Sequence, residues 1–262
     1  MERHGIRPDT DLGQHFLLDE NLVDVALRMA EVGPTDVVLE VGAGLGTLTA
    51  ALGRTARVVH ALEVDPRMRA PLAEATEGLD GVHVHWGDCM KVDLEALDPP
   101  PTAVVSNLPY HVATPILIET ICRLPAVTRW ALMTQREVAD RWLSPSGSRL
   151  YGAPSVIVQL ACEGTGRRSV GREVFSPRPR VDSALVGLRR IAPPPAAATR
   201  SLVRAAFTAR RKTLANALGQ TGVDRALVHD ALEALGLDRA ARPEQVPPAD
   251  YPRLAEAIGW QG

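Results

Sequence analysis

Cysteine and long apolar runs are both scarce in this sequence of 262 residues. The three cysteines lie far apart and lack CxxC spacing, so a disulfide framework is not expected. The longest apolar runs are interrupted by Glu40, Asn107 or Gln159 well before the ~18 residues that a membrane span requires. The N-terminus also lacks the apolar region of a signal peptide. We therefore expect a cytoplasmic protein that makes no membrane contact.

Lysine is nearly absent as well, since only Lys91 and Lys212 accompany the arginines. The net charge of −2 by itself predicts nothing about nucleic acid, but the charge is unevenly distributed. Between residues 165 and 212, twelve basic residues stand against Glu173 and Asp182, so this segment carries +10 and the remainder −12. The excess predicts either a surface that binds a polyanion or a set of solvated helix and strand faces.

Strands and helices alternate along the N-terminal part of the chain. Asp19 can cap a helix that extends to about Val32, where Gly33 and Pro34 end it. Continuous apolar runs in βαβ order then predict a parallel sheet that is covered by helices on both faces. The strands are expected at 37–41, 57–64, 82–86, 102–106, 128–133, 170–175 and 184–188, and further helices at 48–55, from 66 onward, at 114–122 and at 136–143.

A proline- and alanine-rich run at 191–199 has the composition of a linker. Beyond it, segments rich in alanine and leucine predict a small helical domain without internal repeats. We therefore expect two domains, an α/β domain at 1–191 and a helical domain at 192–262.

The glycine-rich turn GAGLG, residues 42–46, directly follows the first predicted strand. Such a turn lets the backbone approach a ligand, although any doubly wound sheet accepts the same glycines. Glu63 ends the next strand and Asp88 follows the third, and the carboxyl ends of parallel strands line one crevice. Either carboxylate alone is typical of a surface or capping residue. Together with the turn they indicate an adenosine-bearing cofactor, either S-adenosylmethionine or a nicotinamide dinucleotide. The glycine spacing of the turn does not match the GxGxxG motif of dinucleotide-binding proteins.

The stretch SNLPY, residues 106–110, distinguishes between these cofactors. Proline holds Leu108 in an extended conformation, so an amide, an outward carbonyl and an aromatic ring lie side by side. If Asn107 Oδ1 and the Leu108 carbonyl each accept one N–H of an adenine or cytosine amine, the amine lone pair faces a methyl group, while Tyr110 stacks on the base. Alternatively, Asn107 opens a turn and Tyr110 packs in the core. The position after the fourth strand favours S-adenosylmethionine and N-methylation.

A series of motifs in the same order resembles the small-subunit ribosomal RNA dimethyladenosine transferases, which are related to the erythromycin-resistance methyltransferases. The resemblance extends from Leu12 to about Leu214. Its pieces are LGQHFL, EVGAGLGTLT, EVD, GD, NLPYHVATPIL, MTQREVADR, YGAPSV, FSPRPRVDSALV and FTARRKTL. It implies a Rossmann-like methyltransferase sheet at 1–191 and a small C-terminal all-α domain at 192–262.

The resemblance also implies roles for the residues at matching positions. The cofactor, S-adenosylmethionine, would contact His15, Leu17, Gly42, Glu63, Asp88 and Asn107. Asn107 and Leu108 would receive the target nitrogen, and Tyr110 and Phe175 would enclose the flipped base between their rings. His15 stands where the family commonly has asparagine, and we expect its backbone to matter more than its ring.

The implied substrate is a pair of adjacent adenosines in a hairpin loop near the 3′ end of small-subunit rRNA, each methylated twice at N6 in a pre-ribosomal particle. The basic residues would contact phosphates, which orient RNA without reading its sequence. They are Arg178 and Arg180 beside the base pocket, and Arg204, Arg210, Arg211 and Lys212 at helix-like intervals. A monomer suffices, and no metal site is expected.

Three alternatives remain open from the sequence. A resistance methyltransferase would use the same chemistry on one adenine of large-subunit rRNA, although NLPYHVATP and YGAPSV favour the small-subunit branch. The chain could also be a ribosome-assembly factor, for which the cell needs its binding to the ribosomal particle rather than its methylation. A nicotinamide-dependent dehydrogenase is the least consistent with the motifs.

Overall fold

A computed structural model describes residues 4–9 and 13–261 of the chain. Contacts between residues divide the chain into two compact units. The first contains residues 1–139 and 164–190, and the second contains residues 140–163 and 191–262. Within the described residues, no helix is both long and apolar enough to cross a membrane.

The second unit is larger than the helical domain that the sequence predicts, because it includes residues 140–163 as well as the chain after 190. Hydrogen bonds join these two stretches: the Tyr151 hydroxyl donates to Val246 O at 2.9 Å, and Gly147 N donates to Glu244 O at 2.6 Å. The composition of the proline-rich run at 191–199 predicts a boundary at 191. It cannot predict that residues 140–163 contact the chain after 190, because composition describes only the segment itself.

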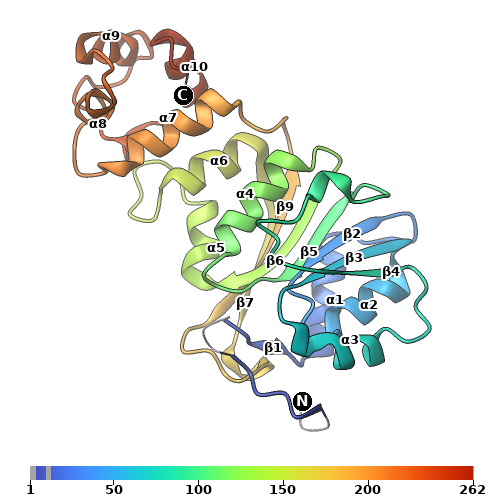
Figure 1. The fold of residues 1–262 in the computed structure, drawn as a ribbon. Coiled ribbons are helices and arrows are strands. Elements are labelled where there is room, and N and C mark those ends of the chain that lie inside the picture. Colours follow the sequence, from blue (N-terminus) through green and yellow to red (C-terminus); the bar gives the residue numbers. More distant parts are fainter. Residues whose placement is uncertain (1–3, 10–12, 262) are drawn as a thin grey trace. The chain divides into compact units, whose positions relative to one another are not determined.

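The first unit is built on a seven-stranded sheet with the order β4-β3-β2-β5-β6-β9-β7 (Figure 1). Strands β2 to β6 are parallel to one another, and β9 is antiparallel to β6. The bounds are β2 Val37–Val41, β3 Val58–Glu63, β4 Val82–Trp86, β5 Ala103–Asn107, β6 Arg129–Gln135, β7 Cys162–Val170 and β9 Ser183–Arg190. The chain order reverses between β2 and β5, and ligands bind at such a switch point, outside the carboxyl ends of the strands.

Helices cover both faces of this sheet, as the continuous apolar strands predict. The helices α1 (Glu20–Met29), α2 (Thr47–Thr55) and α3 (Arg69–Ala75) pack their buried side chains into one hydrophobic core with alternate residues of the strands. On the other face, α4 (Ala113–Arg123) is tied to the sheet because Trp130 Nε1 donates to Thr120 Oγ1 at 3.1 Å. Asp19 caps α1 as predicted, and the helix ends at Met29, short of Val32.

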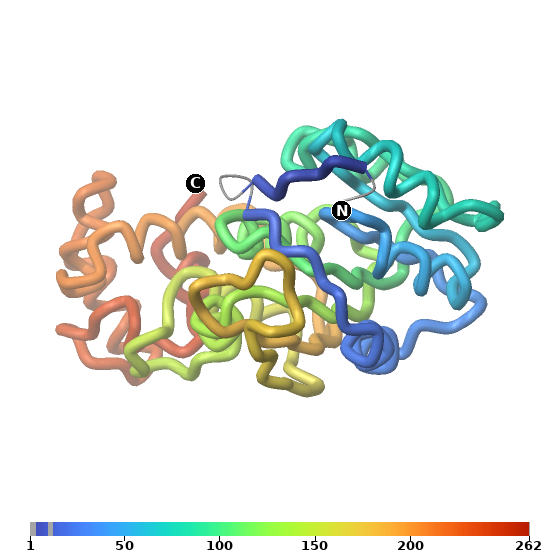
Figure 2. The backbone as a smooth tube through the Cα atoms, turned by 90° about the horizontal axis from the view of Figure 1, so that it is seen from below, coloured from blue at the N-terminus to red at the C-terminus, as the bar shows by residue number. Residues whose placement is uncertain are grey.

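A short ribbon brings the N-terminal segment beside a loop that lies far along the sequence (Figure 2). Strand β1 (Phe16–Leu17) pairs antiparallel with β8 (Phe175–Ser176), so that Leu17 lies opposite Phe175 and Phe16 opposite Ser176. The strand predicted at 170–175 is therefore wrong, since β7 ends at Val170 and a single 3-10 turn precedes β8. Directly opposed residues share one face of a ribbon, which decides where these side chains point.

The second unit is helical. Its helices include α6 Ala153–Ala161, α7 Ala197–Thr208, α8 Leu214–Leu218, α9 Arg225–Ala234 and α10 Asp250–Ala257. Three rings form part of its core: Phe207 lies 6.0 Å from Tyr151 and 6.2 Å from Tyr251, between ring centroids. The Tyr251 hydroxyl is buried and donates to Pro243 O at 2.8 Å, so the polar end of this ring is satisfied.

Candidate active site

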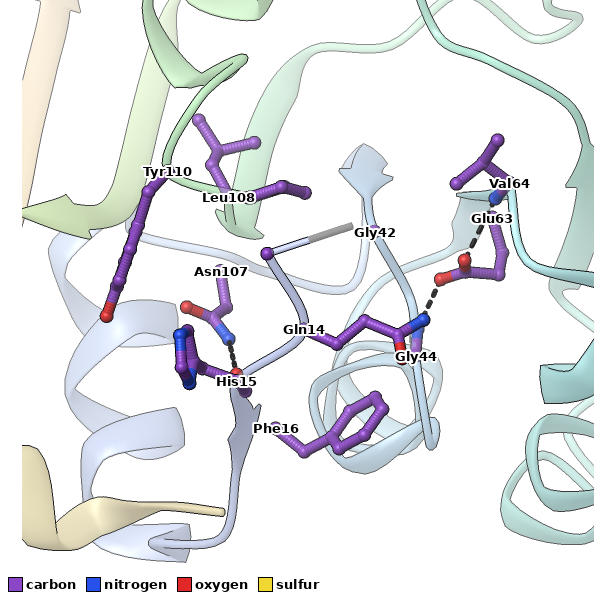
Figure 3. Close-up of a pocket in the computed structure, with 12 residues that line it drawn as sticks. Gln14, His15, Phe16, Gly42, Gly44, Glu63, Val64, Asn107, Leu108 and Tyr110 are labelled. Carbon is purple, nitrogen blue, oxygen red and sulfur yellow. Dashed lines mark hydrogen bonds between the residues drawn. The ribbon is translucent and has the colours of Figure 1, made fainter. Parts of the chain in front are cut away.

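Three adjoining hollows open at the carboxyl ends of β2, β3 and β5, and all of them are lined by Gly42. The central hollow is shown in Figure 3. Its lining includes Gln14, His15, Gly42, Glu63, Asn107, Leu108 and Tyr110. The chain thus brings together six of the residues that the sequence singles out, from four separate segments. Leu12, with which the resemblance begins, lies outside the described residues.

The glycine turn leaves the centre of the site open. Gly42 and Gly44 have φ angles of +83° and +56°, in the left-handed region that favours glycine. A Cβ on Gly44 would lie 3.1 Å from the Phe16 ring, and a Cβ on Gly42 would lie 3.5 Å from the Pro109 ring. Side chains at these positions would narrow the hollow, which is why a glycine cradle suits a ligand that lies against the backbone.

Glu63 is held by backbone N–H groups at the end of β3. Its carboxylate is 5% exposed and accepts hydrogen bonds from Gly44 N at 2.7 Å, Val64 N at 2.9 Å and Asp65 N at 2.8 Å. Burial raises the pKa of Glu63, and the three hydrogen bonds oppose that rise. A carboxylate has about four acceptor positions, so this one retains capacity for a ligand hydroxyl.

Asp88 lines a neighbouring hollow whose walls are mainly apolar. These walls include Leu62, Val64 and Ile116. Asp88 Oδ1 accepts from Met90 N at 2.9 Å, while Lys91 Nζ lies 3.9 Å from Oδ2. An apolar hollow with a carboxylate in its lining fits a purine whose amino group needs an acceptor, so this part of the site suits an adenosine-bearing cofactor.

Glu40 is a site residue that the sequence analysis does not single out. It is 1% exposed on β2, lines the third hollow with Phe16 and Leu17, and its Oε2 has no hydrogen-bond partner in the described parts of the chain. Burial raises the pKa of Glu40 to about 8, so the carboxyl is mainly protonated at neutral pH. The signal in the sequence is an acidic residue inside a fully apolar strand, which is costly unless a ligand uses it.

The segment that carries His15 is attached across the site by a buried carboxylate. Gln14 Nε2 donates to Asp65 Oδ2 at 2.7 Å, and Arg67 binds the same carboxylate through Nε and Nη2. The Arg67 hydrogen bonds lower the pKa of Asp65 to about 2. Asp65 N also donates to Glu63, so one short loop fixes both the Glu63 carboxylate and the N-terminal segment.

Two hydrogen-bond acceptors lie next to each other on the turn after β5. Asn107 Nδ2 donates to His15 O at 2.9 Å, and because a carbonyl can only accept, this bond sets the orientation of the amide. Asn107 Oδ1 then points toward Tyr110 and His15 (Figure 3). Leu108 N donates to Met133 O at 2.9 Å, which anchors the turn to β6. Neither Asn107 Oδ1 nor Leu108 O accepts a hydrogen bond from any residue that the structure describes.

The Tyr110 ring lies beside these acceptors. The ring that stacks on it in this structure is that of His15, whereas the family motif predicts Phe175 as the second ring around the base. The Tyr110 hydroxyl lies 2.7 Å from Ser183 Oγ, and burial raises the pKa of the phenol. The His15 imidazole stacks on the Tyr110 ring at a centroid distance of 5.3 Å and an angle of 28°. Both the backbone and the ring of His15 therefore lie at the site, and the expectation that the backbone matters more stays a prediction.

Phe175 lies in the hydrophobic core rather than in the lining of the central hollow, and it is 3% exposed. The physical reason is the register of the ribbon, which places Phe175 directly opposite Leu17, on the face that packs into the core. The enclosure of a flipped base between Tyr110 and Phe175 therefore stays a prediction, and it would require the Phe175 ring to leave the core.

The predicted RNA-binding residues are all exposed, and only Arg204 lies on a helix. They are Arg178 and Arg180 in the first unit, and Arg204, Arg210, Arg211 and Lys212 in the second. Because α7 ends at Thr208 and α8 begins at Leu214, residues 210–212 form a turn rather than the helical face that their spacing predicts. Arg210 Nη2 donates to Arg149 O at 2.8 Å, which helps to hold this turn.

Comparisons with known proteins agree with this geometry. The family model described as "Ribosomal RNA adenine dimethylase" matches residues 6–259. The "Ribosomal RNA small subunit methyltransferase A" of Kineococcus radiotolerans is 43% identical and is aligned over 97% of this chain and 87% of its own length. The protein of the same name from Thermobifida fusca is 42% identical, over 96% of this chain and 91% of its own length.

Solved structures give the same result. A dimethyladenosine transferase from Plasmodium falciparum has a TM-score of 0.78 at 25% identity and covers 94% of this chain and 99% of its own. The 23S rRNA methyltransferase ErmE has a TM-score of 0.68 at 30% identity and covers 93% of this chain and 99% of its own. The fold class and the resemblance expected from the sequence are confirmed. The chain belongs to the ribosomal RNA adenine dimethylase family.

Proposed function

We propose that this chain transfers methyl groups to N6 of two adjacent adenosines in a hairpin loop near the 3′ end of small-subunit rRNA, using S-adenosylmethionine, during assembly of the small subunit. Membership of the family makes it an rRNA adenine dimethyltransferase. Curated relatives named as small-subunit methyltransferases align with nearly the whole chain, which supports the choice of rRNA. We further propose that it acts as a monomer in the cytoplasm.

The observation that carries this proposal is the pair of unused acceptors on the turn after β5, Asn107 Oδ1 and Leu108 O, beside the Tyr110 ring. An adenine amine is a poor nucleophile because its lone pair is delocalised into the ring. Two acceptors that each take one N–H hold the nitrogen with its lone pair directed away from both, toward the cofactor side of the hollow. Positioning of this kind accounts for much of a rate enhancement without any general base.

The residues of the cofactor side fit an adenosine-bearing methyl donor. Glu63 would take the ribose hydroxyls, Asp88 the adenine amine, and the backbone at Gly42 would lie against the ligand. When bound, S-adenosylmethionine supplies an electrophilic methyl group on a sulfonium. Glu40, buried and unpartnered at Oε2, lines the hollow where the amino-acid end of such a ligand would find a polar group.

Charge development explains why carbonyl oxygens suit this reaction. As N6 bonds to the methyl carbon, the carbon–sulfur bond breaks, and the amine becomes cationic. Its N–H groups then donate more strongly to Asn107 Oδ1 and Leu108 O, so the two oxygens stabilise the transition state more than the ground state. The excess proton leaves to water afterwards. A monomethylated amine retains one N–H, so one acceptor remains engaged in the second transfer while the other faces the methyl group.

We propose that the exposed basic residues of each unit contact phosphates of the RNA. Arg178 and Arg180 follow directly on β8, whose partner strand β1 enters the site. Residues 210–212 form a turn in the second unit, which we propose as the RNA-binding unit. Phosphate contacts of this type position the substrate and leave the choice of adenine to the shape of the loop.

Methyl incorporation tests this proposal. Labelled S-adenosylmethionine is offered to unmodified small subunits and, separately, to large subunits, with the wild-type chain and with Asn107→Ala. We expect label in N6,N6-dimethyladenosine of the small subunit and little label with the variant. Label confined to large subunits would contradict the proposal and favour the activity named for ErmE, to which the structure is also similar.

A further inference from the structure

The His15 side chain covers the Tyr110 ring inside the central hollow. The two rings are stacked with a centroid distance of 5.3 Å and an interplanar angle of 28°. Both line the hollow together with Asn107 and Leu108, and Figure 3 shows the Asn107 oxygen pointing toward the same two rings. The imidazole therefore lies where an incoming base would meet Tyr110.

Two hydrogen bonds hold His15 in this place. Its carbonyl oxygen accepts from Asn107 Nδ2 at 2.9 Å, and its ring Nδ1 lies 2.8 Å from Pro177 O. Because a carbonyl can only accept, Nδ1 carries the proton. Pro177 directly precedes Arg178, so the ring of His15 is attached to the segment that we propose to contact RNA phosphates.

The spacing of the two rings leaves no room for a third ring between them. A base inserted between two stacked rings needs roughly 7 Å, twice the ~3.5 Å contact distance between carbon atoms. The observed 5.3 Å is too short, and Phe175, the other candidate for a stacking partner, is buried in the core. An adenine can lie on this face of Tyr110 only after the imidazole has moved.

We propose that His15 is a placeholder for the target adenine, a positioning residue whose imidazole stacks on Tyr110 in the RNA-free enzyme and is displaced when the base enters. This inference rests on the proposed function, because it assumes that the base stacks on Tyr110. The His15 imidazole covers the face of the Tyr110 ring before RNA binds, and a base must stack more strongly than the imidazole to displace it. His15 thereby raises the threshold for binding a base at the site.

Two substitutions at His15 are expected to change RNA affinity in opposite directions. His15→Asn removes the ring and keeps the backbone carbonyl that binds Asn107, so the target base no longer competes with an imidazole. His15→Phe keeps a ring over Tyr110. We expect the asparagine variant to bind a hairpin RNA with 2-aminopurine at the target position about five- to tenfold more tightly, and the phenylalanine variant to bind it more weakly by a similar factor. The measurement is quenching of 2-aminopurine fluorescence, with KM and kcat for methylation of small subunits determined in parallel.

His83→Asn is a matched control, because His83 is exposed on β4 of the first unit, its ring also lies near another ring, 5.8 Å from that of His60, and it lines none of the three hollows. It should leave RNA affinity within twofold of wild type. Opposite shifts of KM in the two His15 variants, each larger than the change in kcat, support the placeholder. Weaker RNA binding in both variants overturns it, because that result indicates a purely structural role.

Failure of the proposed function would look different from failure of the placeholder. In the first case the wild-type chain would methylate no small subunits, whereas opposite shifts in 2-aminopurine affinity would still support displacement of His15. In the second case small subunits would be methylated normally, and the two variants would not differ in sign.

Discussion

The two sides of the central hollow are built in different ways. On the cofactor side, Gly42 and Glu63 lie at the ends of adjacent parallel strands, and backbone N–H groups fix the Glu63 carboxylate. On the base side, His15 and Tyr110 come from segments far apart in the sequence and meet through their rings. The backbone of the sheet fixes the geometry of the cofactor side, whereas the geometry of the base side depends on strand register and side-chain rotamers. The side chains of the base side can therefore move when the substrate binds.

The largest effect is expected at Phe175, which the family motif assigns to the base side and which the structure buries in the core. Phe175→Ala should lower the free energy of unfolding by about 3–5 kcal/mol, because it leaves a cavity beside Leu17. Phe175→Leu, which fills most of that space, should cost less. Urea denaturation measures both. A fully stable alanine variant with a lost methylation rate would show instead that this ring works on the base.

Asn107→Ala tests the acceptor pair at the junction of the two sides. We expect kcat to fall by about 10²–10³, as for the loss of one preorganised polar group in other transition-state sites. Single-turnover methyl transfer is the measurement. Asn21→Ala, at an exposed asparagine of α1 in the first unit, is the matched control and should have wild-type kinetics. A loss smaller than tenfold at Asn107 would mean that its amide is not engaged in the reaction.

Glu40 allows the cofactor side to be tested through pH. Its pKa is raised from 4.5 to about 8, so the native state holds a proton that the unfolded chain releases. The stabilisation is fully present below about pH 4.5 and is lost as pH rises toward about 8, by an amount on the order of a few kcal/mol. Glu40→Gln, neutral at every pH, should flatten this dependence in urea unfolding at pH 5 and pH 8.5.

The control for that experiment is Glu256→Gln, at an exposed glutamate of α10. It should retain the wild-type dependence of stability on pH. If Glu40→Gln also retains that dependence, the buried carboxyl is ionised across the whole range, and its assignment as a protonated group is incorrect.

The smallest effect concerns the turn at residues 210–212, which belongs to neither side of the hollow. Replacing Arg210, Arg211 and Lys212 with alanine should reduce the slope of log affinity against log salt by about 2, since each lost phosphate contact contributes ~0.7 for single-stranded RNA. Cofactor affinity should not change. Arg54 and Arg57, exposed on the first unit, are the control pair. An unchanged salt slope would remove this turn from the RNA-binding surface.

The sequence predicts those parts of the site that short stretches of chain determine. The glycine turn, Glu63 at a strand end and the NLPY turn each follow an apolar strand, and a parallel sheet brings such ends together. The α/β fold is predicted for the same reason. The sequence does not predict helix α6, because the apolar run at 153–161 has no clear helical period and cannot be distinguished from a buried strand.

The remaining errors come from contacts between distant segments. The family motif predicts Phe175 at the base pocket, whereas in this structure the pairing of β8 with β1 places its ring in the core. The stacking of His15 on Tyr110 depends on that same ribbon, and no local pattern encodes it. The turn at residues 210–212 breaks a helix that residue spacing alone extends through it. Side-chain direction is therefore the property that the sequence predicts least well here.

A crystal structure with S-adenosylhomocysteine and a small-subunit loop RNA tests the central claim most directly. We predict that N6 of the target adenine lies within hydrogen-bond distance, about 2.7–3.2 Å, of both Asn107 Oδ1 and Leu108 O, with the base stacked on Tyr110. An adenine amine that reaches neither oxygen, with the Asn107 amide still engaged only by His15, would contradict the account.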